Sequence, residues 1–289
     1  MTTALRIATR GSRQAWAQAT VVADSLAAAT GRVVELVEIT TTGDIQSEVP
    51  LHSIGGQGVF VKEVQRAVLD GRADIAAHSA KDLTSGAADG LLLAAFTERR
   101  DARDALIGST LDDLPDGAMV ASGSVRRRAQ IRRVRPDLEF AELRGNIDNR
   151  LSKIPAGGAI VMAVAALQIL DMTDRIAEML SIDDFVPAIG QGCVAIECRL
   201  GDSATIEALA AIDHAPTRHD VEVERAFLAE LGSGCSLPVG GHVVDGVLHT
   251  FLANLATGLS IGDHVALTGD AGDIETARNA ARSAYDALN

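Results

Sequence analysis

The apolar positions in the first part of the chain repeat with two different periods. Some segments alternate or run continuously, as strands do, and others place apolar residues three and four positions apart, as helices do. These patterns predict strands at Leu5–Arg10, Val33–Thr40, Ala73–Ala77 and Leu91–Phe96, and helices at Ala15–Ala29 and Phe60–Leu69. The polar segment Glu98–Asp104 that follows is typical of a linker.

The alternation of the two periods resumes after this segment. It predicts strands at Met119–Ala121, Leu138–Leu143 and Ala159–Ala165, helices at Val125–Arg135, Ile147–Lys153 and Arg175–Leu180, then a strand at Cys193–Cys198 and a helix at Ala204–Ile212. Strands that alternate with helices indicate parallel sheets covered by helices, which is an α/β fold.

The pattern changes in the last part of the chain. The Asp245-Gly246 pair lies between two apolar runs and predicts a hairpin with a type I′ turn. The whole segment is predicted to form a small α+β domain, with a helix at Asp220–Leu231, a turn at Gly232–Pro238, strands at Val243–Val244, Val247–Leu255 and His264–Thr268, and a helix at Ile274–Leu288.

Length and composition are those of a globular protein with more than one domain. With 289 residues, 47% of them hydrophobic, the chain can bury two or three cores. No apolar run approaches the ~20 residues of a membrane helix, and the N-terminus lacks the apolar region of a signal peptide. Three cysteines without a CxxC pair indicate no disulfide framework. These features predict a cytoplasmic protein.

The charges are unevenly distributed. A net charge of −13 argues against nonspecific nucleic-acid binding, which needs a positive surface. The chain has only three lysines but 23 arginines, and eight of these arginines lie between Arg126 and Arg150. The group is either a solvated helix face or the binding site of an anionic ligand, since the planar guanidinium group suits carboxylates and phosphates. Composition alone leaves both interpretations open.

Several standard catalytic and metal-binding motifs are absent. The chain has no GxGxxG after a strand, no GxxxxGK[ST] and no GxSxG, and the spacing of histidine and cysteine predicts no metal site. The glycine-rich stretch Gly55–Gly58 is either a flexible surface loop or a lid. Cys193 and Cys198 lie in an apolar strand and are expected to be buried, inert thiols.

Cys235 has a different setting from the other two cysteines. It lies in GSGCSLP, where small residues after a helix let the backbone turn and leave a side chain accessible. It is either an ordinary turn cysteine or a nucleophile, and a nucleophile would need a lowered thiol pKa that the sequence does not reveal.

Three polar segments follow predicted strands, at the end where open α/β sheets bind ligands. The first segment is His78–Asp82. Its Asp82 either forms an ion pair with Lys81 or uses its carboxylate in acid–base or electrostatic catalysis. The other two segments, Ser122–Arg127 and Leu143–Asn146, combine helix starts with arginines, which favours anion binding.

Taken together, these segments resemble the porphobilinogen deaminase family along the whole chain. The matching stretches are RIATRGS, TTGD, HSAKDL, SGSVRR, LRGN with the following Arg150–Lys153, IGQG, IECR and GSGCSLP, in the family's order. The resemblance implies two doubly wound α/β lobes like those of periplasmic binding proteins, and a small α+β domain that carries the cofactor cysteine. The implied domains are 1–98 with 189–213, 102–188, and 216–289.

The resemblance also implies a chemistry. A dipyrromethane cofactor would be attached by a thioether to Cys235, and four porphobilinogen molecules would be joined head to tail with loss of ammonia, releasing hydroxymethylbilane. Asp82 would stabilise the cation that forms when porphobilinogen loses ammonia. The enzyme would be a monomer without a metal and would pass its product to the next tetrapyrrole enzyme. The residues implied to bind the cofactor or the substrate carboxylates are Arg10, Ser12, Lys81, Ser122, Ser124, Arg126, Arg127, Arg144, Asn146, Arg150 and Gln191.

The chain departs from the family pattern at four positions. Ser53 and Gln57 stand where lysines are common, Ile169 where an arginine often follows the strand, and Gly123 where the family has a hydroxyl residue. With these residues the substrate site would have fewer basic side chains. This would affect substrate affinity and the late elongation steps more than the type of reaction.

Two other functions fit part of the pattern. A carboxylate-binding receptor could have the same two lobes, but it would not need Cys235. A cysteine hydrolase would need a histidine directed at Cys235, and the nearest in sequence, His219 and His242, have no supporting context.

Overall fold

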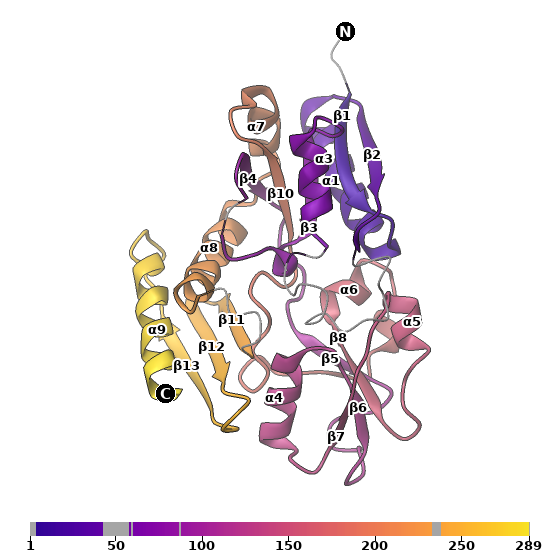
Figure 1. Ribbon diagram of the computed structural model, residues 1–289, viewed down its shortest axis with the longest axis vertical. Helices are drawn as coiled ribbons and strands as arrows, with labels where there is room; N and C mark the ends of the chain where they lie inside the picture. The colour runs from indigo at the N-terminus through magenta and orange to yellow at the C-terminus, as the bar shows by residue number, and fades with distance from the viewer. Residues whose placement is uncertain (1–3, 43–57, 59, 87, 233–237, 289) are drawn as a thin grey trace. The chain divides into compact units, whose positions relative to one another are not determined.

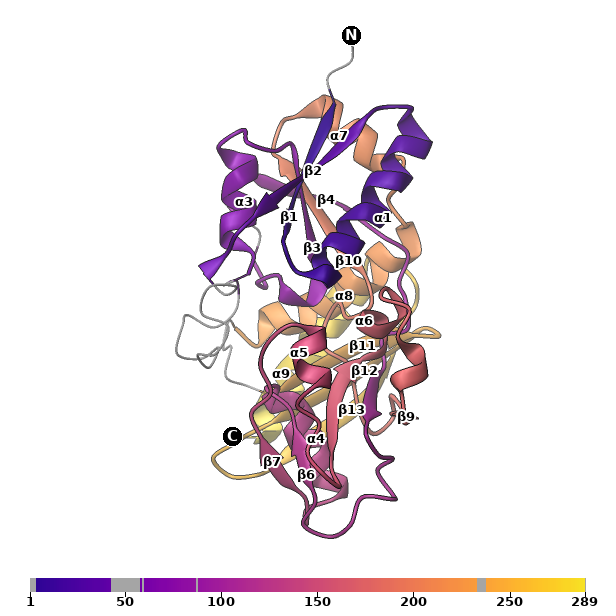
Figure 2. The ribbon, with the colours of Figure 1, turned by 90° about the vertical axis from the view of Figure 1, so that its right-hand side faces the viewer.

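The computed structural model describes residues 4–42, 58, 60–86, 88–232 and 238–288. The chain divides into two compact units, Met1–Arg100 with Cys193–Arg218 and Asp101–Gly192 with His219–Asn289. Both units are drawn in Figures 1 and 2. The division into three domains with the boundaries given above stays a prediction.

The first unit is a five-stranded sheet with helices on both faces. The strand order is β2-β1-β3-β10-β4, made of β1 (Leu5–Arg10), β2 (Val34–Ile39), β3 (Ile75–Ser79), β4 (Leu91–Phe96) and β10 (Val194–Arg199). β1 is parallel to β2 and β3, whereas β10 is antiparallel to β3 and β4. Helices α1 (Arg13–Thr30) and α7 (Ser203–Ala210) pack on one face, and α3 (Lys62–Leu69) packs on the other (Figure 2).

The alternation of side chains along β1 explains the two cores of this unit. Leu5 and Ile7 contact α1 and α7 on one face, and Ala8 contacts α3 on the other. Helix α1 begins where the Ser12 hydroxyl accepts a hydrogen bond from the Ala15 amide. It ends at Gly31, whose φ of 66° suits glycine.

The second unit contains two sheets. The first has the order β7-β6-β8-β5-β9, with β5 (Asp104–Ile107), β6 (Met119–Ala121), β7 (Glu139–Ala141), β8 (Ala159–Ala163) and β9 (Glu178–Met179). β6 is parallel to β7 and β8, and β5 is antiparallel to β8 and β9. Helix α4 (Val125–Val134) contributes Ile131 to its core, and the short helices α5 (Ile147–Leu151) and α6 (Val164–Gln168) follow β7 and β8.

The other sheet of this unit is an antiparallel meander. Strands β11 (Val239–Val244), β12 (Val247–Ala253) and β13 (Ser260–Ala266) lie in that order. Helices α8 (Ala215–Glu230) and α9 (Asp273–Leu288) contribute to the core that covers one face of it. The hairpin prediction is confirmed, because Asp245 and Gly246 both have positive φ, 50° and 73°.

The structure corrects four predictions about the elements. Parallel sheets were expected, but β5 and β10 run antiparallel to their neighbours. The predicted helix at Arg175–Leu180 is wrong, because the Ala177 and Leu180 amides donate to backbone carbonyls of β5 and the segment contains β9. The predicted linker ends too late, since Asp104 is the first residue of β5. The strand predicted at Ala159–Ala165 stops at residue 163, where α6 begins.

Within the described ranges, none of the helices combines the length and the apolar character that a bilayer crossing requires.

Candidate active site

A pocket of the first unit lies at the carboxyl ends of two neighbouring parallel strands, β1 and β3. Arg10 is the last residue of β1, and Asp82 belongs to the short 3-10 helix Ala80–Asp82 that follows β3 directly. Both line the pocket, together with Ala15, Gln18, Phe60, Val61, Ala77, His78 and Ser79. The pocket therefore sets a carboxylate and a guanidinium group beside apolar and hydrogen-bonding side chains.

The backbone around Asp82 is held by the sheet. The Ala80 amide donates to the Cys193 carbonyl at 3.0 Å, and the Leu83 amide donates to the Ala80 carbonyl at 3.3 Å. Leu83 is buried, while Lys81 and Asp82 are half-buried. These hydrogen bonds fix the backbone on both sides of Asp82, and the Asp82 side chain lines the pocket.

Two further contacts shape the pocket wall. The guanidinium carbon of Arg10 lies 4.0 Å from the centre of the Phe60 ring, a cation–π arrangement. The Ser79 hydroxyl donates to the Gln18 amide oxygen at 3.0 Å. Ser12, which was predicted to bind a ligand, has a structural task here, because its hydroxyl is the N-cap of α1.

A buried polar group lies behind the pocket. His78 Nε2 is 3.1 Å from Glu197 Oε2, and both side chains are at most 5% exposed. Gln65 on α3 donates from Nε2 to the same carboxylate oxygen at 2.8 Å. The Glu197 carboxylate on β10 thereby links His78 of β3 to Gln65 of α3, and it holds the end of β3 in place.

The second unit has a buried ionic cluster around Asp104, which is 1% exposed. Arg126 Nη2 donates to Oδ2 at 2.8 Å, Arg127 Nη2 donates to Oδ1 at 2.7 Å, and Gln191 Nε2 donates to Oδ1 at 2.8 Å. Burial by itself would raise the pKa of Asp104, but the charges of the two arginines outweigh it and hold that pKa far below its ordinary value.

This cluster bears on three predicted binding residues. The guanidinium groups of Arg126 and Arg127 also donate to the carbonyls of Val186 and Val161, at 2.6 and 3.1 Å. In the structure the carboxylate that these two arginines bind is the protein's own Asp104, and Gln191 joins them. That any of the three binds substrate stays a prediction.

The polar side chains at the start of α4 accept hydrogen bonds from backbone amides. The Ser124 hydroxyl caps α4, and the Ser122 hydroxyl accepts a hydrogen bond from the Ser124 amide at 3.2 Å. Asn146 caps α5 in the same way. Between the two serines, a Cβ atom at Gly123 would lie 2.8 Å from the Leu143 carbonyl oxygen. In this chain the Leu143 carbonyl thus leaves little room for a Cβ atom at position 123.

Most of the clustered arginines have partners inside the protein. Arg128 pairs with Glu142, Arg133 with Asp184 and Arg135 with Asp137, and Arg150 Nε donates to the Gly145 carbonyl. Among the described residues, the buried Nε atoms of Arg127 and Arg144 both lack a hydrogen-bond partner, but Arg127 already binds the Asp104 carboxylate through Nη2. Arg144 is therefore the arginine whose surroundings best fit an incoming anion.

The structure brings some of the predicted residues together and leaves others outside its scope. Arg10 and Asp82 share the first pocket, and Arg126, Arg127 and Gln191 share the Asp104 cluster. Cys235, Ser53 and Gln57 lie outside the described residues. Ile169 is the C-cap of α6. The sequence did not reveal Asp104, Gln18 or Phe60, and only the apolar run after Asp104 could have indicated its strand.

The other two cysteines are buried, as predicted. Burial raises the pKa of the Cys198 thiol to about 11, so this thiol is protonated and unreactive at neutral pH.

Comparison with known proteins identifies relatives over most of the chain. Residues 5–207 match the family model described as "Porphobilinogen deaminase, dipyromethane cofactor binding domain". A protein named porphobilinogen deaminase from Syntrophotalea carbinolica is 45% identical over 245 residues, covering 83% of this chain and 78% of its own. One with the same name from Roseiflexus castenholzii is 45% identical over 246 residues, covering 83% and 81%. Among solved structures, the methionine-binding protein MetQ is 13% identical with a TM-score of 0.44, covering 74% of this chain and 89% of its own.

Proposed function

The chain belongs to the porphobilinogen deaminase family, and from this membership we propose how its own residues carry out the reaction. The enzyme joins four porphobilinogen molecules head to tail with loss of ammonia, and it releases the linear tetrapyrrole hydroxymethylbilane. The observation that carries the assignment of residues is the pocket of the first unit, where Asp82 and Arg10 both line the cavity at the carboxyl ends of β1 and β3.

Asp82 stabilises positive charge in this pocket. When porphobilinogen loses ammonia, positive charge develops on the pyrrole carbon and nitrogen, and a fixed carboxylate lowers the free energy of that state. A carboxylate held by a buried backbone needs no reorganisation during the reaction, which is the main advantage of such a group.

Arg10 binds a carboxylate of the substrate from the wall of the same pocket. Each porphobilinogen carries an acetate and a propionate, so the site must neutralise negative charge as well as stabilise positive charge. The Phe60 ring, 4.0 Å from the guanidinium carbon, holds this cation at the pocket wall, and a planar guanidinium group suits carboxylates.

The dipyrromethane cofactor supplies, when bound, the pyrrole end to which the substrate units are added. We assign its thioether link to Cys235, because this cysteine lies in the family's GSGC motif and the other two thiols are buried. The carboxylates of the cofactor and of the growing tetrapyrrole need cationic partners. Arg144, whose buried Nε has no hydrogen-bond partner among the described residues, fits that need. Arg150 and Lys81 are assigned to the same carboxylates from the family motifs.

The enzyme is further proposed to act as a cytoplasmic monomer that binds neither nucleic acid nor membranes. Its net charge of −13 supports the first of these exclusions. The molar mass of the purified protein can be measured by light scattering. A mass of 30.1 kDa would support a monomer, and twice that mass would refute it.

A single assay tests the function. The purified full-length protein is mixed with porphobilinogen, and the products are followed by mass spectrometry. Release of a linear tetrapyrrole with four equivalents of ammonia supports the proposal. Binding of porphobilinogen without turnover would instead favour a carboxylate-binding receptor.

A further inference from the structure

A row of three histidines crosses the three-stranded sheet of the second unit. His242 lies opposite His249 in the register of β11 and β12, and His249 lies opposite His264 in that of β12 and β13. Residues directly opposite each other in antiparallel strands project from the same face. Leu248, the neighbour of His249, packs with Ala277 of α9 on the other face. The three histidines therefore lie on the face turned away from α9.

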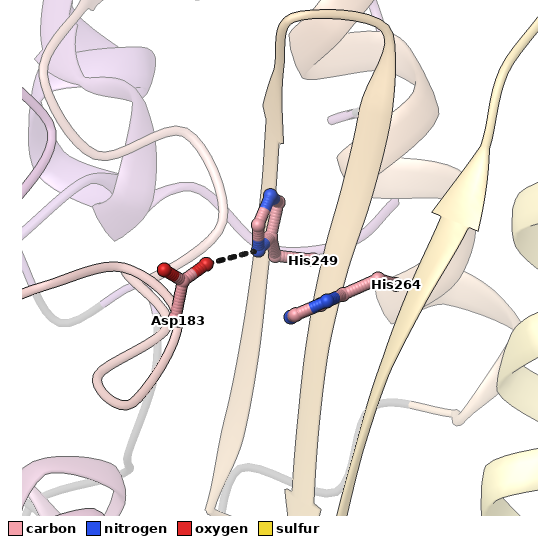
Figure 3. Close-up of side chains that lie close together, drawn as sticks. All are labelled: Asp183, His249 and His264. Carbon is pink, nitrogen blue, oxygen red and sulfur yellow. Dashed lines mark ion pairs between the residues drawn. The ribbon is translucent and has the colours of Figure 1, made fainter.

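Two of these histidines come together with a carboxylate. The ring centroids of His249 and His264 are 4.4 Å apart, and the rings are tilted by 53°. Asp183, from the loop after β9, places Oδ1 3.8 Å from Nδ1 of His249 (Figure 3). One ligand atom from each of the three residues lies within 4.8 Å of the other two. Figure 3 shows the three side chains converging from two strands and a loop.

The nitrogen at the centre of this group is Nδ1 of His249. His249 Nδ1 is buried, and no group among the described residues pairs with it in hydrogen-bonding geometry. The His249 side chain is 10% exposed, whereas that of Asp183 is 68% exposed. A buried polar atom without a partner is costly and needs an explanation, and a bound ion that accepts its lone pair is one.

The loop that carries Asp183 is positioned by other contacts. The Phe185 amide donates to the Ser181 carbonyl at 2.9 Å, and the Asp183 amide donates to the Ser181 hydroxyl at 3.4 Å. Arg133 Nη2 donates to the Asp184 carbonyl at 3.0 Å and lies 3.5 Å from its carboxylate. Arg133 thus pairs with Asp184, whereas the neighbouring Asp183 carboxylate faces the histidines.

We propose that Asp183, His249 and His264 bind a divalent transition-metal ion such as Zn²⁺. Two imidazoles and one carboxylate suit Zn²⁺, Co²⁺, Ni²⁺ and Cu²⁺, whereas Mg²⁺ and Ca²⁺ prefer oxygen ligands alone. Tetrahedral bonds of about 2.0–2.1 Å set ligand atoms about 3.4 Å apart. Asp183 and His264 are exposed, so their side chains can move by the small distance required. The ion would fasten the loop after β9 to the sheet and keep a fourth position for water.

The test uses the untagged full-length protein after treatment with EDTA and dialysis. CoCl₂ is added and its visible absorption is recorded, and ZnCl₂ binding is measured by calorimetry. We expect one saturable site per chain. Asp183→Asn and His264→Gln should each weaken binding at least about tenfold. Loss of a residue that only hydrogen-bonds to a metal ligand already lowers metal affinity by about this factor. Asp286→Asn, an exposed carboxylate on α9 outside the site, is the matched control and should leave affinity unchanged.

Two results would overturn the site. One is the absence of saturable Co²⁺ and Zn²⁺ binding by the unaltered protein. The other is equal affinity in the His249→Gln/His264→Gln double variant, which would assign the ion to other groups. Because His264 is exposed, the single His264→Gln variant should fold normally, and it decides the question if the buried His249 does not tolerate replacement. Zn²⁺ should also raise the melting temperature of the unaltered protein but not of His264→Gln.

Discussion

Arginine side chains have two different tasks in this protein, and only their surroundings separate them. Arg126 and Arg127 neutralise the buried Asp104, and Arg128 pairs with Glu142. Arg144 belongs to the same run in the sequence, yet its buried Nε has no partner among the described residues. The sequence shows that arginines are concentrated in this segment. It could not tell which of them serve the fold, because their carboxylate partners lie 14 to 23 residues away.

Replacing Arg144 should therefore impair substrate binding more than folding. Arg144→Leu removes a cation that we assign to substrate or cofactor carboxylates, at a cost of about 1.5–3 kcal/mol. The apparent KM for porphobilinogen should rise about tenfold to a hundredfold. Steady-state kinetics measures this rise.

The matched control is Arg128→Leu, which removes an arginine that has protein partners. This variant should lower the melting temperature and leave KM nearly unchanged. An unchanged KM in Arg144→Leu would show that this arginine is also structural.

Asp82 is the residue on which the proposed chemistry depends most. Asp82→Asn keeps the shape of the side chain but removes its charge, so kcat should fall about 10²–10³-fold while KM changes little. Asp82→Glu keeps the charge in a shifted position and should lose less. Turnover and melting temperature are measured on the same samples, with the exposed Asp89→Asn as control.

The opposite pattern would remove Asp82 from the mechanism. If this carboxylate only forms an ion pair with a neighbour, Asp82→Asn lowers the melting temperature and retains normal kcat.

At the scale of elements, patterns that depend on neighbouring residues were predictable and those that depend on distant pairing were not. The Asp245-Gly246 turn and most of the helices and strands follow from local sequence. The antiparallel direction of β10 and the short strand β9 depend on backbone pairing with distant strands. The histidine row has the same origin, because His249 and His264 meet only through the register of β12 and β13.

Asp104 joins β5 to α4 and should make the second unit sensitive to acid. Its pKa is far lower in the folded chain than the ordinary ~3.9, because the arginine charges outweigh the effect of burial. Such a carboxylate stabilises the fold fully above its unfolded pKa, and this stabilisation is lost as the pH falls through that value toward the folded pKa. The urea midpoint of the protein should thus begin to fall below about pH 5.

Asp104→Asn isolates this contribution. The change leaves two buried arginines without a countercharge and should cost about 3–5 kcal/mol at pH 7. The difference in unfolding free energy between the variant and the unaltered protein should shrink as the pH is lowered. The fully exposed Asp116→Asn serves as control. A difference that stays constant from pH 7 down to about pH 2 would contradict the lowered pKa of Asp104.

On the scale of the whole molecule, we assign the chemistry to segments that are distant in the sequence. The proposed residues are Arg10 and Asp82 in the first unit and Arg144 and Arg150 in the second, and Cys235 belongs to the segment after α8. The family motifs in the sequence were sufficient to predict the reaction. The supporting groups were not predictable, because a charged residue such as Asp104 looks like surface until its partners are known.

The central claim is that this chain carries a dipyrromethane on Cys235, and the mass of the intact purified protein tests it most directly. We predict that the full-length chain is heavier than its sequence by one covalently bound dipyrromethane. The Cys235→Ser variant should have the mass of the bare sequence, because a hydroxyl is a far weaker nucleophile than a thiolate. An unaltered protein with only the mass of its sequence, or an adduct that persists in Cys235→Ser, would contradict the account.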